Sequence, residues 1–211
     1  MGALNGSMSA SKLYVGGELP KDLRRSYLER IALRTFRPLR VDEEAEERAG
    51  WCALGQALDL ELSVEKVFSG PYLALGLRVD RYRFPPQVIK AELAKAAQAA
   101  LAKSGQERLS KAQKSELEKR VVQGLRRKYL PSMLVCDVVW HLDRGELYFW
   151  SQSRGLIERL SALFELTFGL ELTENSPYVS AQRLLPTKPH LARLAEVTLT
   201  PFHADPALGS R

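Results

Sequence analysis

Residues 84–129 read FPPQVIKAELAKAAQAALAKSGQERLSKAQKSELEKRVVQGLRRKY, and this stretch decides how the chain is organised. The proline pair at its start suits the first turn of a helix. Apolar residues such as Ile89, Leu93 and Leu101 then recur at helical spacing, and the high alanine content favours a helix to about Lys103.

A second helix is predicted after a short polar break at Ser104-Gly105. Ser110 followed three residues later by Gln113 is a capping-box pattern, which indicates a helix start. The helix should run to about Tyr129, because Pro131 prevents further helical pairing. Together the two segments predict a helical hairpin.

The charge of the protein is concentrated on this hairpin. From Lys103 through Lys128 there are nine lysines and arginines against three acidic residues, a local excess of +6 that equals the formal net charge of the whole chain of 211 residues. The remainder of the sequence is therefore electrically balanced. A polyanion would meet the excess on the hairpin.

The second helix separates an apolar side from a basic side. At 100° per residue, Leu117, Val121, Val122, Leu125 and Tyr129 share one side. Lys119, Arg120, Arg126 and Arg127 fall on the opposite side, where such a row can follow a phosphate backbone. A solvated helix face, partly offset by Glu116 and Glu118, is the alternative interpretation. No helix-turn-helix or other base-reading pattern accompanies the cations, so any DNA recognition should depend on backbone charge.

We therefore take the basic side chains of the second helix and its N-terminal approach as candidate DNA contacts. They are Arg108, Lys111, Lys114, Lys119, Arg120, Arg126, Arg127 and Lys128. Tyr129, beside the last three, is a candidate hinge or contact aromatic.

The flanking segments predict an α+β fold: antiparallel sheets with packed helices, from which the hairpin projects. Strands are expected at 11–19, 50–62, 71–84, 133–142 and 146–150, helices at 20–37 and 153–166, and 167–172 is a candidate further strand. The organisation is then an N-terminal body part (1–84), a basic hairpin or tip (85–130), and a C-terminal body part (131–211) that ends in a loose tail.

Two of these predictions rest on short patterns. Leu33 continues the helical spacing of Tyr27 and Ile31, which places it on the apolar side of the first helix. The alternation of Leu58 with Leu60 and Leu62 favours a strand there.

Catalytic motifs are missing from the sequence. It contains no GxxxxGK[ST], GxGxxG, HExxH or GxSxG, and His141, His190 and His203 show no regular spacing with acids or cysteines. A metal-dependent nuclease stays open as a lesser alternative. Its candidate groups are Glu116, Glu118, Lys119, Asp137 and Asp143. We expect no enzyme activity, no cofactor and no metal.

The remaining special side chains are expected inside the protein. Trp140 and Trp150 lie among valines and leucines, which favours core positions, and Trp51 would stack on bases only if exposed. Cys52 and Cys136 lack any CxxC or Cys/His spacing and are predicted to be reduced and buried.

The composition of the chain limits the cellular locations to be considered. With 45% hydrophobic and 27% charged residues the chain reads as globular, and no uncharged run approaches a membrane span. The uncharged start lacks the pattern of a signal peptide. We expect a cytoplasmic protein, at the nucleoid if DNA is its partner.

With these residues in place, the sequence resembles the bacterial recombination-associated protein RdgC family between about residues 51 and 177. The resemblance rests on an ordered series: Gly50-Trp51, Phe84-Pro85-Pro86, Val88-Ile89-Lys90 with Leu93 and Lys95, Leu109-Ser110-Lys111 to Lys114 and Leu117, Arg126-Arg127-Lys128-Tyr129, Val138-Val139-Trp140, and Asp143.

The resemblance implies a non-enzymatic protein that forms a ring-shaped homodimer around duplex DNA, with little sequence preference, and limits access of the RecA recombinase. It implies a tip hairpin that closes the ring, with Arg108, Lys111 and Lys114 on its basic helix and Tyr129 near its end. Members of that family usually extend well beyond the matched region, into parts that contribute to the ring. A shorter clamp, a different dimer and another role on the same scaffold are therefore open alternatives. A preference for single strands also stays open, as does a scaffold that docks an acidic protein partner.

Overall fold

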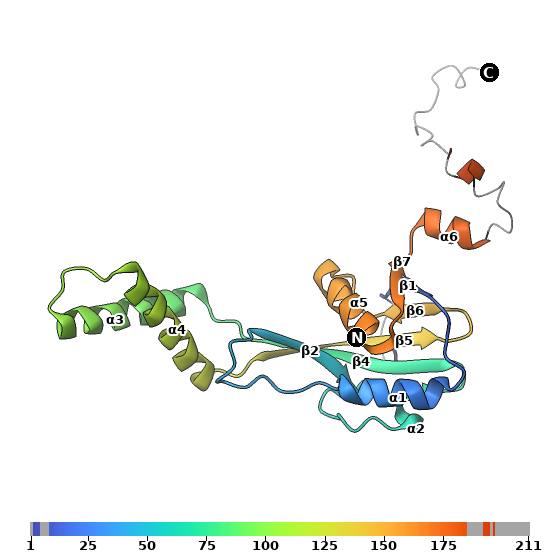
Figure 1. Cartoon of the computed structure of the whole chain (residues 1–211), viewed down its shortest axis with the longest axis horizontal. Coiled ribbons are helices and arrows are strands. Elements are labelled where there is room, and N and C mark those ends of the chain that lie inside the picture. The colour runs from blue at the N-terminus through green and yellow to red at the C-terminus, as the bar shows by residue number, and fades with distance from the viewer. Residues whose placement is uncertain (1, 5–8, 185–191, 195, 197–211) are drawn as a thin grey trace, which may run out of the picture. The chain divides into compact units, whose positions relative to one another are not determined.

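The computed structural model describes residues 2–4, 9–184, 192–194 and 196. Two compact units divide the chain, residues 1–173 and residues 174–211. Figure 1 shows the elements, which are β1 (Ser11–Gly16), α1 (Leu23–Leu33), β2 (Glu47–Cys52), α2 (Val64–Val67), β3 (Phe68–Ser69), β4 (Tyr72–Arg81), α3 (Pro86–Ser104), α4 (Lys111–Lys128), β5 (Ser132–His141), β6 (Glu146–Phe149), α5 (Arg154–Phe168), β7 (Glu171–Glu174) and α6 (Pro177–Leu184).

A single sheet organises the first unit, and it confirms the predicted α+β class. The strand order is β2-β4-β5-β6-β1-β7, with β3 paired to β4. The longest ladder joins β4 to β5, antiparallel, from Tyr72↔His141 to Arg81↔Ser132. One sheet thus stands where several were predicted, because β4 and β5 connect the N-terminal strands to the C-terminal ones.

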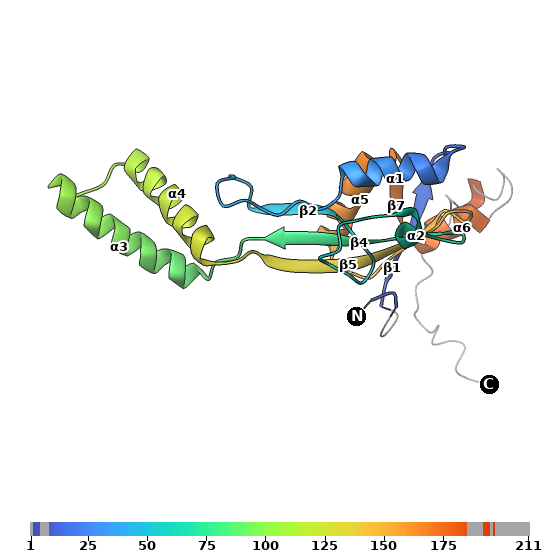
Figure 2. The ribbon, with the colours of Figure 1, turned by 90° about the horizontal axis from the view of Figure 1, so that it is seen from below.

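The core lies on one face of this sheet, under α1 and α5 (Figure 2). The predicted apolar face of strand β4 is confirmed, since Leu73, Leu75, Leu77 and Val79 are all buried; Arg78 and Asp80 on its other face are buried as well. Helices α1 and α5 cover them with their apolar sides, so burial of aliphatic and aromatic area is the main stabilising contribution.

Aromatic rings fill the centre of the core. The ring centroid of Trp140 lies 5.2 Å from that of Phe164 and 5.6 Å from that of Phe168, both edge-on. Trp51 is fully buried and donates its indole N–H to Thr167 Oγ1 at 2.9 Å. The core position of Trp140 is confirmed, Trp51 joins it and so cannot stack on bases, and Trp150 is half-buried.

Both cysteines are buried and unbridged, as predicted. The Cys52 Sγ lies 3.4 Å from the carbonyl oxygen of Gly76. Burial, the largest cause, raises the pKa of the Cys52 thiol to about 11 and also raises the pKa of Cys136. These thiols pack as small apolar groups.

Three predictions about local structure are wrong. Residues 57–62 are not a strand, because the chain turns at Gly55 (φ +68°) and Ala53 N–H donates to the Asp59 carbonyl at 2.9 Å. The first helix ends at Leu33 rather than at residue 37, because Arg34 and Phe36 bond to Trp51 of β2, and Leu33 is 71% exposed. Helix α5 continues to Phe168 before the αL residue Gly169, so the following strand β7 begins only at Glu171.

The second unit contains α6 among its described residues. Its first turn is held by Ser176, whose Oγ accepts from Val179 N–H at 3.1 Å and whose carbonyl accepts from Ser180 N–H at 2.8 Å. No residue of α6 is buried. The loose tail predicted for the last ten residues lies outside the described residues. In the part of the chain that the structure describes, no helix is both long and apolar enough to cross a membrane.

One glycine fixes how the segment after α1 meets the sheet. Phe36 N–H donates to the Trp51 carbonyl at 2.8 Å, and Trp51 N–H donates to the Arg34 carbonyl at 3.0 Å. This brings the Phe36 backbone so close to Gly50 that a Cβ on Gly50 would overlap the Cα and N of Phe36. Only glycine permits this approach.

We predict that Gly50→Ala lowers the free energy of unfolding by about 1 to 3 kcal/mol, because backbone atoms must shift to admit the methyl group. The matched control is Gly124→Ala, where a Cβ meets no atom within 4 Å and alanine suits the helix, with an expected gain of about 0.5 to 1 kcal/mol. Urea unfolding followed by circular dichroism measures both. Equal midpoints for the two variants would contradict the close approach.

Candidate nucleic-acid interface

The predicted hairpin is present as α3 and α4, and its turn is built by local hydrogen bonds. Gly105 ends α3 in the left-handed conformation (φ 64°), and its N–H donates to the Leu101 carbonyl at 3.0 Å. At the start of α4, Ser110 N–H donates to Gln113 Oε1 at 2.8 Å and Gln113 N–H donates to Ser110 Oγ at 3.2 Å. The capping box read from the sequence is confirmed.

The hairpin is an insertion between two paired strands. The β4–β5 ladder ends at Arg81↔Ser132, so the chain leaves the sheet toward α3 and returns from α4 at the same place (Figures 1 and 2). The hairpin belongs to the same compact unit as the sheet.

The hairpin is almost entirely solvent-accessible. No residue of α3 is buried, and in α4 only Leu125 and Arg126 are. Leu117 and Val121, from the apolar side of α4, are half-buried. Side chains along most of the hairpin can therefore meet a ligand without any rearrangement of a core.

Seven of the eight predicted cations are exposed on α4 or its approach. They are Arg108, Lys111, Lys114, Lys119, Arg120, Arg127 and Lys128. In the described part of the chain, five of these form no ion pair and no side-chain hydrogen bond, namely Arg108, Lys111, Lys114, Lys119 and Arg127. Their charges are free to attract an anion.

The other two exposed cations form weak pairs. Arg120 Nε lies 3.1 Å from Glu116 Oε1, with the side chains 72% and 58% exposed. Lys128 Nζ lies 3.8 Å from Glu92 Oε1. Exposed pairs of this kind contribute about 0 to 1 kcal/mol, so a phosphate can compete for the cation.

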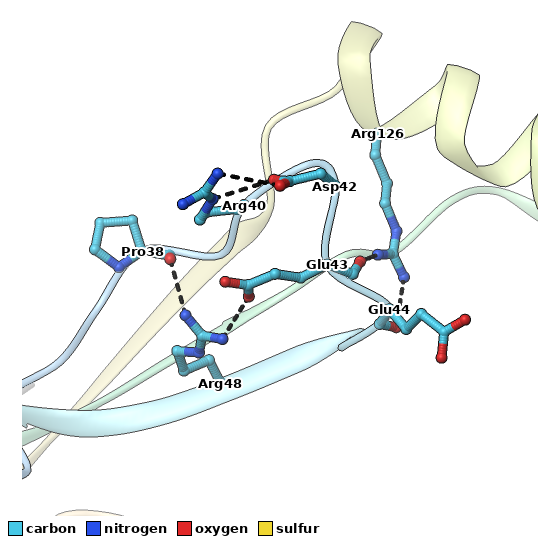
Figure 3. Close-up of polar contacts among 7 residues, drawn as sticks. All are labelled: Pro38, Arg40, Asp42, Glu43, Glu44, Arg48 and Arg126. Atoms are coloured by element: carbon cyan, nitrogen blue, oxygen red, sulfur yellow. Dashed lines mark hydrogen bonds and ion pairs between the residues drawn. The ribbon is translucent and has the colours of Figure 1, made fainter.

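Arg126 is the exception, and its assignment as an exposed DNA contact is wrong. Its residue is 7% exposed. As Figure 3 shows, its guanidinium donates through Nη1 to the carbonyl of Glu43 and through Nη2 to the carbonyl of Glu44, the latter at 3.2 Å. The guanidinium carbon also lies 5.2 Å from the ring centroid of Tyr82. Arg126 thus fastens the base of α4 to the loop before β2.

That loop is itself held by arginines (Figure 3). Arg48 donates through Nη1 to the Pro38 carbonyl at 3.1 Å and pairs through Nη2 with the Glu43 carboxylate. Arg40 makes a two-pronged pair with Asp42, both bonds at 3.1 Å. These contacts hold the acidic loop residues Asp42 and Glu43 in place, and the carbonyl oxygens of Glu43 and Glu44 accept from Arg126.

The helical spacing contained a signal for this role of Arg126. Arg126 follows Val122 by four residues and Leu125 by one, so it borders the apolar side of α4 rather than the centre of the basic side. Nothing in the sequence indicated its partners, because Glu43 and Glu44 are more than eighty residues away.

Tyr129 lies at the junction of the hairpin with β5. It is the C-cap residue of α4, its N–H donates to the Leu125 carbonyl at 2.9 Å, and its side chain is packed edge-on against Phe84 with ring centroids 6.0 Å apart. It remains 44% exposed. The position fits either a packing hinge or a contact aromatic.

The groups weighed for a nuclease are not brought together as a metal site. Among the residues that the structure describes, no three His, Cys, Asp or Glu side chains are placed to hold a metal ion. Asp137 is buried and accepts from Ala3 N–H at 2.7 Å, whereas Asp143 is exposed in the turn before β6. His141 packs edge-on against Tyr72 at 4.8 Å. His190 and His203 lie outside the described residues.

Neither the models of protein families nor the curated proteins with which the sequence was compared give a match.

We predict that Arg126→Ala lowers the free energy of unfolding by about 2 to 3 kcal/mol, because the carbonyls of Glu43 and Glu44 lose their donors. Arg126→Lys should restore only part of this, since an ammonium lacks the planar fork. Arg127→Ala, at the exposed neighbouring position, should stay within about 0.5 kcal/mol. Urea unfolding gives the stabilities. Hydrogen exchange of residues 42–46 should rise in Arg126→Ala alone, and unchanged exchange there would refute the anchoring role.

Proposed function

We propose that this protein binds DNA without sequence preference, through the exposed cations of the α3–α4 hairpin. The observation that carries the proposal is the set of exposed, mostly unpaired basic side chains on an element that holds the entire net charge excess. The contacts we assign are Arg108, Lys111, Lys114, Lys119, Arg120, Arg127 and Lys128.

The physical basis is release of counterions. Each phosphate that a lysine or arginine neutralises steepens the fall of log affinity with log salt by about 0.9 for duplex DNA. Because several free cations lie on one helix, we expect the affinity for duplex DNA to depend strongly on salt concentration. The glutamines at the entry of α4 are used within the turn: Gln113 forms the capping box with Ser110, and its Nε2 donates to Gln106 Oε1 at 3.4 Å. Their engagement supports binding through the backbone of duplex DNA rather than through its sequence.

The family resemblance supports the same proposal and extends it. A protein similar to the RdgC family would act as a homodimer on DNA and limit RecA-type recombinases, without catalysing a reaction, in the bacterial nucleoid. We adopt this as the working function, and a scaffold that docks an acidic protein through the hairpin is the alternative.

The proposal is tested by reversing charge on the hairpin. We expect Lys111→Glu, Lys119→Glu and Arg127→Glu combined to weaken binding of a fluorescent random-sequence duplex more than tenfold at about 0.15 M salt, and to reduce the salt slope by about 2 to 3. Fluorescence anisotropy over a salt series measures both quantities.

The matched control reverses three exposed cations outside the hairpin, Lys21, Arg25 and Arg154, and changes the net charge by the same amount. It should leave the slope almost unchanged. If the wild-type protein does not bind the duplex, the DNA-binding proposal is wrong and the result favours a scaffold that docks an acidic protein. If it degrades the duplex with magnesium or manganese, the protein is a nuclease.

An exposed apolar stretch beside the hairpin supports the homodimer. Leu130 is 93% exposed, and Met133 and Leu134 are about half exposed. On β5, strand β6 pairs with Val138 to His141, so among the described residues 132–136 have a strand partner on the β4 side alone. Such an edge with apolar side chains is suited to pairing with a second copy.

We therefore expect light scattering of the full chain to give twice its 23.7 kDa mass, with or without a short duplex. Leu130→Glu with Met133→Glu should yield the monomer, because buried carboxylates would oppose association. Leu58→Glu, at an exposed leucine in the loop after β2, is the control and should leave the dimer intact. A wild-type monomer at all concentrations would rule out the homodimer.

A further inference from the structure

A second basic surface lies far from the hairpin in sequence, between the end of α1 and α5. It is a groove of about 870 Å³ whose lining includes Leu33, Arg34, Arg37, Arg48, Leu163 and Leu166. We call it the arginine groove. The local net charge of the sequence does not indicate this groove, because acidic residues nearby in sequence balance these arginines.

The groove is built on rigid backbone. Phe36 and Leu39 are buried, and the residues between and beside them, Arg34 and Arg37, point outward. The hydrogen bonds that join Phe36 and Arg34 to Trp51 of β2 hold this segment against the sheet. The backbone of both arginines is therefore held in place before a ligand binds, which lowers the entropic cost of binding.

Its electrostatic balance is positive. Arg34 and Arg37 are exposed, and within the described chain neither guanidinium forms an ion pair or a hydrogen bond. The one carboxylate in the lining, that of Glu43, is already paired with Arg48. Two planar forks thus remain free, and they match the geometry of a carboxylate.

The groove also exposes large apolar side chains. Leu33 is 71% and Leu166 is 64% exposed, and both line the same hollow beside the buried Leu163. A sugar-phosphate backbone has no group that would cover two leucines. A peptide with an apolar side chain between acidic ones satisfies the leucines and the arginines together.

We propose that the arginine groove binds an acidic peptide segment of a partner protein, with an apolar side chain on Leu33 and Leu166 and carboxylates on Arg34 and Arg37. The groove shares no residue with the DNA contacts assigned to the hairpin, although Glu43 of its lining also joins the base of α4 through Arg126.

The probe is a fluorescein-labelled synthetic peptide in which leucines alternate with aspartates, compared with the same peptide carrying serine in place of leucine. Anisotropy titration of the full chain should show the leucine peptide binding at least tenfold more tightly than the serine peptide. Arg34→Glu with Arg37→Glu should weaken the leucine peptide at least tenfold. Leu33→Ser with Leu166→Ser should remove the preference for leucine.

DNA binding serves as the cross-control. The Arg34→Glu, Arg37→Glu variant should retain duplex affinity, and the triple hairpin variant should lose duplex binding yet retain the peptide. Failure of one site is then distinguishable from failure of the other. Because every position changed is exposed, wild-type circular dichroism is expected of each variant.

Three results would overturn the proposal. The first is equal affinity for the leucine and serine peptides, or no binding of either. The second is loss of duplex affinity in the Arg34→Glu, Arg37→Glu variant, which would make the groove a DNA surface. The third is a change in the light-scattering mass of that variant, which would make a second copy of the chain the occupant.

Discussion

The antiparallel pairing of β4 with β5 is the constraint on which the rest of the structure depends. Its ten residue pairs join the two halves of the sheet and supply Leu75, Leu77 and Trp140 to the core. The same ladder brings the two ends of the hairpin together, since residues 82–131 leave and return at its last pair. A long insertion adds little to the free-energy cost of folding here, because the strands already hold its two ends together. The entropic cost of closing a loop grows only slowly with the length of the loop.

The hairpin itself lacks a core of its own. Helix α3 buries no residue, and α4 buries only Leu125 and Arg126 at its base. Local hydrogen bonds, chiefly the capping box at Ser110 and the αL cap at Gly105, define its turn. Arg126 adds to its attachment to the body: two carbonyls accept from its Nη1 and Nη2, and the ring of Tyr82 lies beside the guanidinium, while its buried Nε has no hydrogen-bond partner among the described residues.

Charge has two roles in this molecule, and burial separates them. Arginines that meet carbonyls or carboxylates, such as Arg48, Arg78 and Arg126, hold the chain to itself; Arg78 makes a two-pronged pair with Asp80 inside the protein, at 2.9 and 2.7 Å. Among the described residues, the cations without such partners include five on α4 and its approach and two, Arg34 and Arg37, in the arginine groove. The first group stabilises the fold and the second group gives the protein its proposed partners, DNA on the hairpin and an acidic peptide on the groove.

The sequence by itself determined what local physics controls. The hairpin, its capping box, the alternation of β4 and the concentration of charge on residues 103–128 follow from spacing and residue type within a few turns of chain. The tertiary structure decided what depends on distant partners. It removed Arg126 from the exposed cations, left 57–62 outside the strand pairing, and brought Leu33 and Leu166 together beside Arg34. The reason is that the sequence pattern does not distinguish an arginine or a leucine that faces water from one that packs against a distant residue. Only the folded chain brings that distant residue into contact.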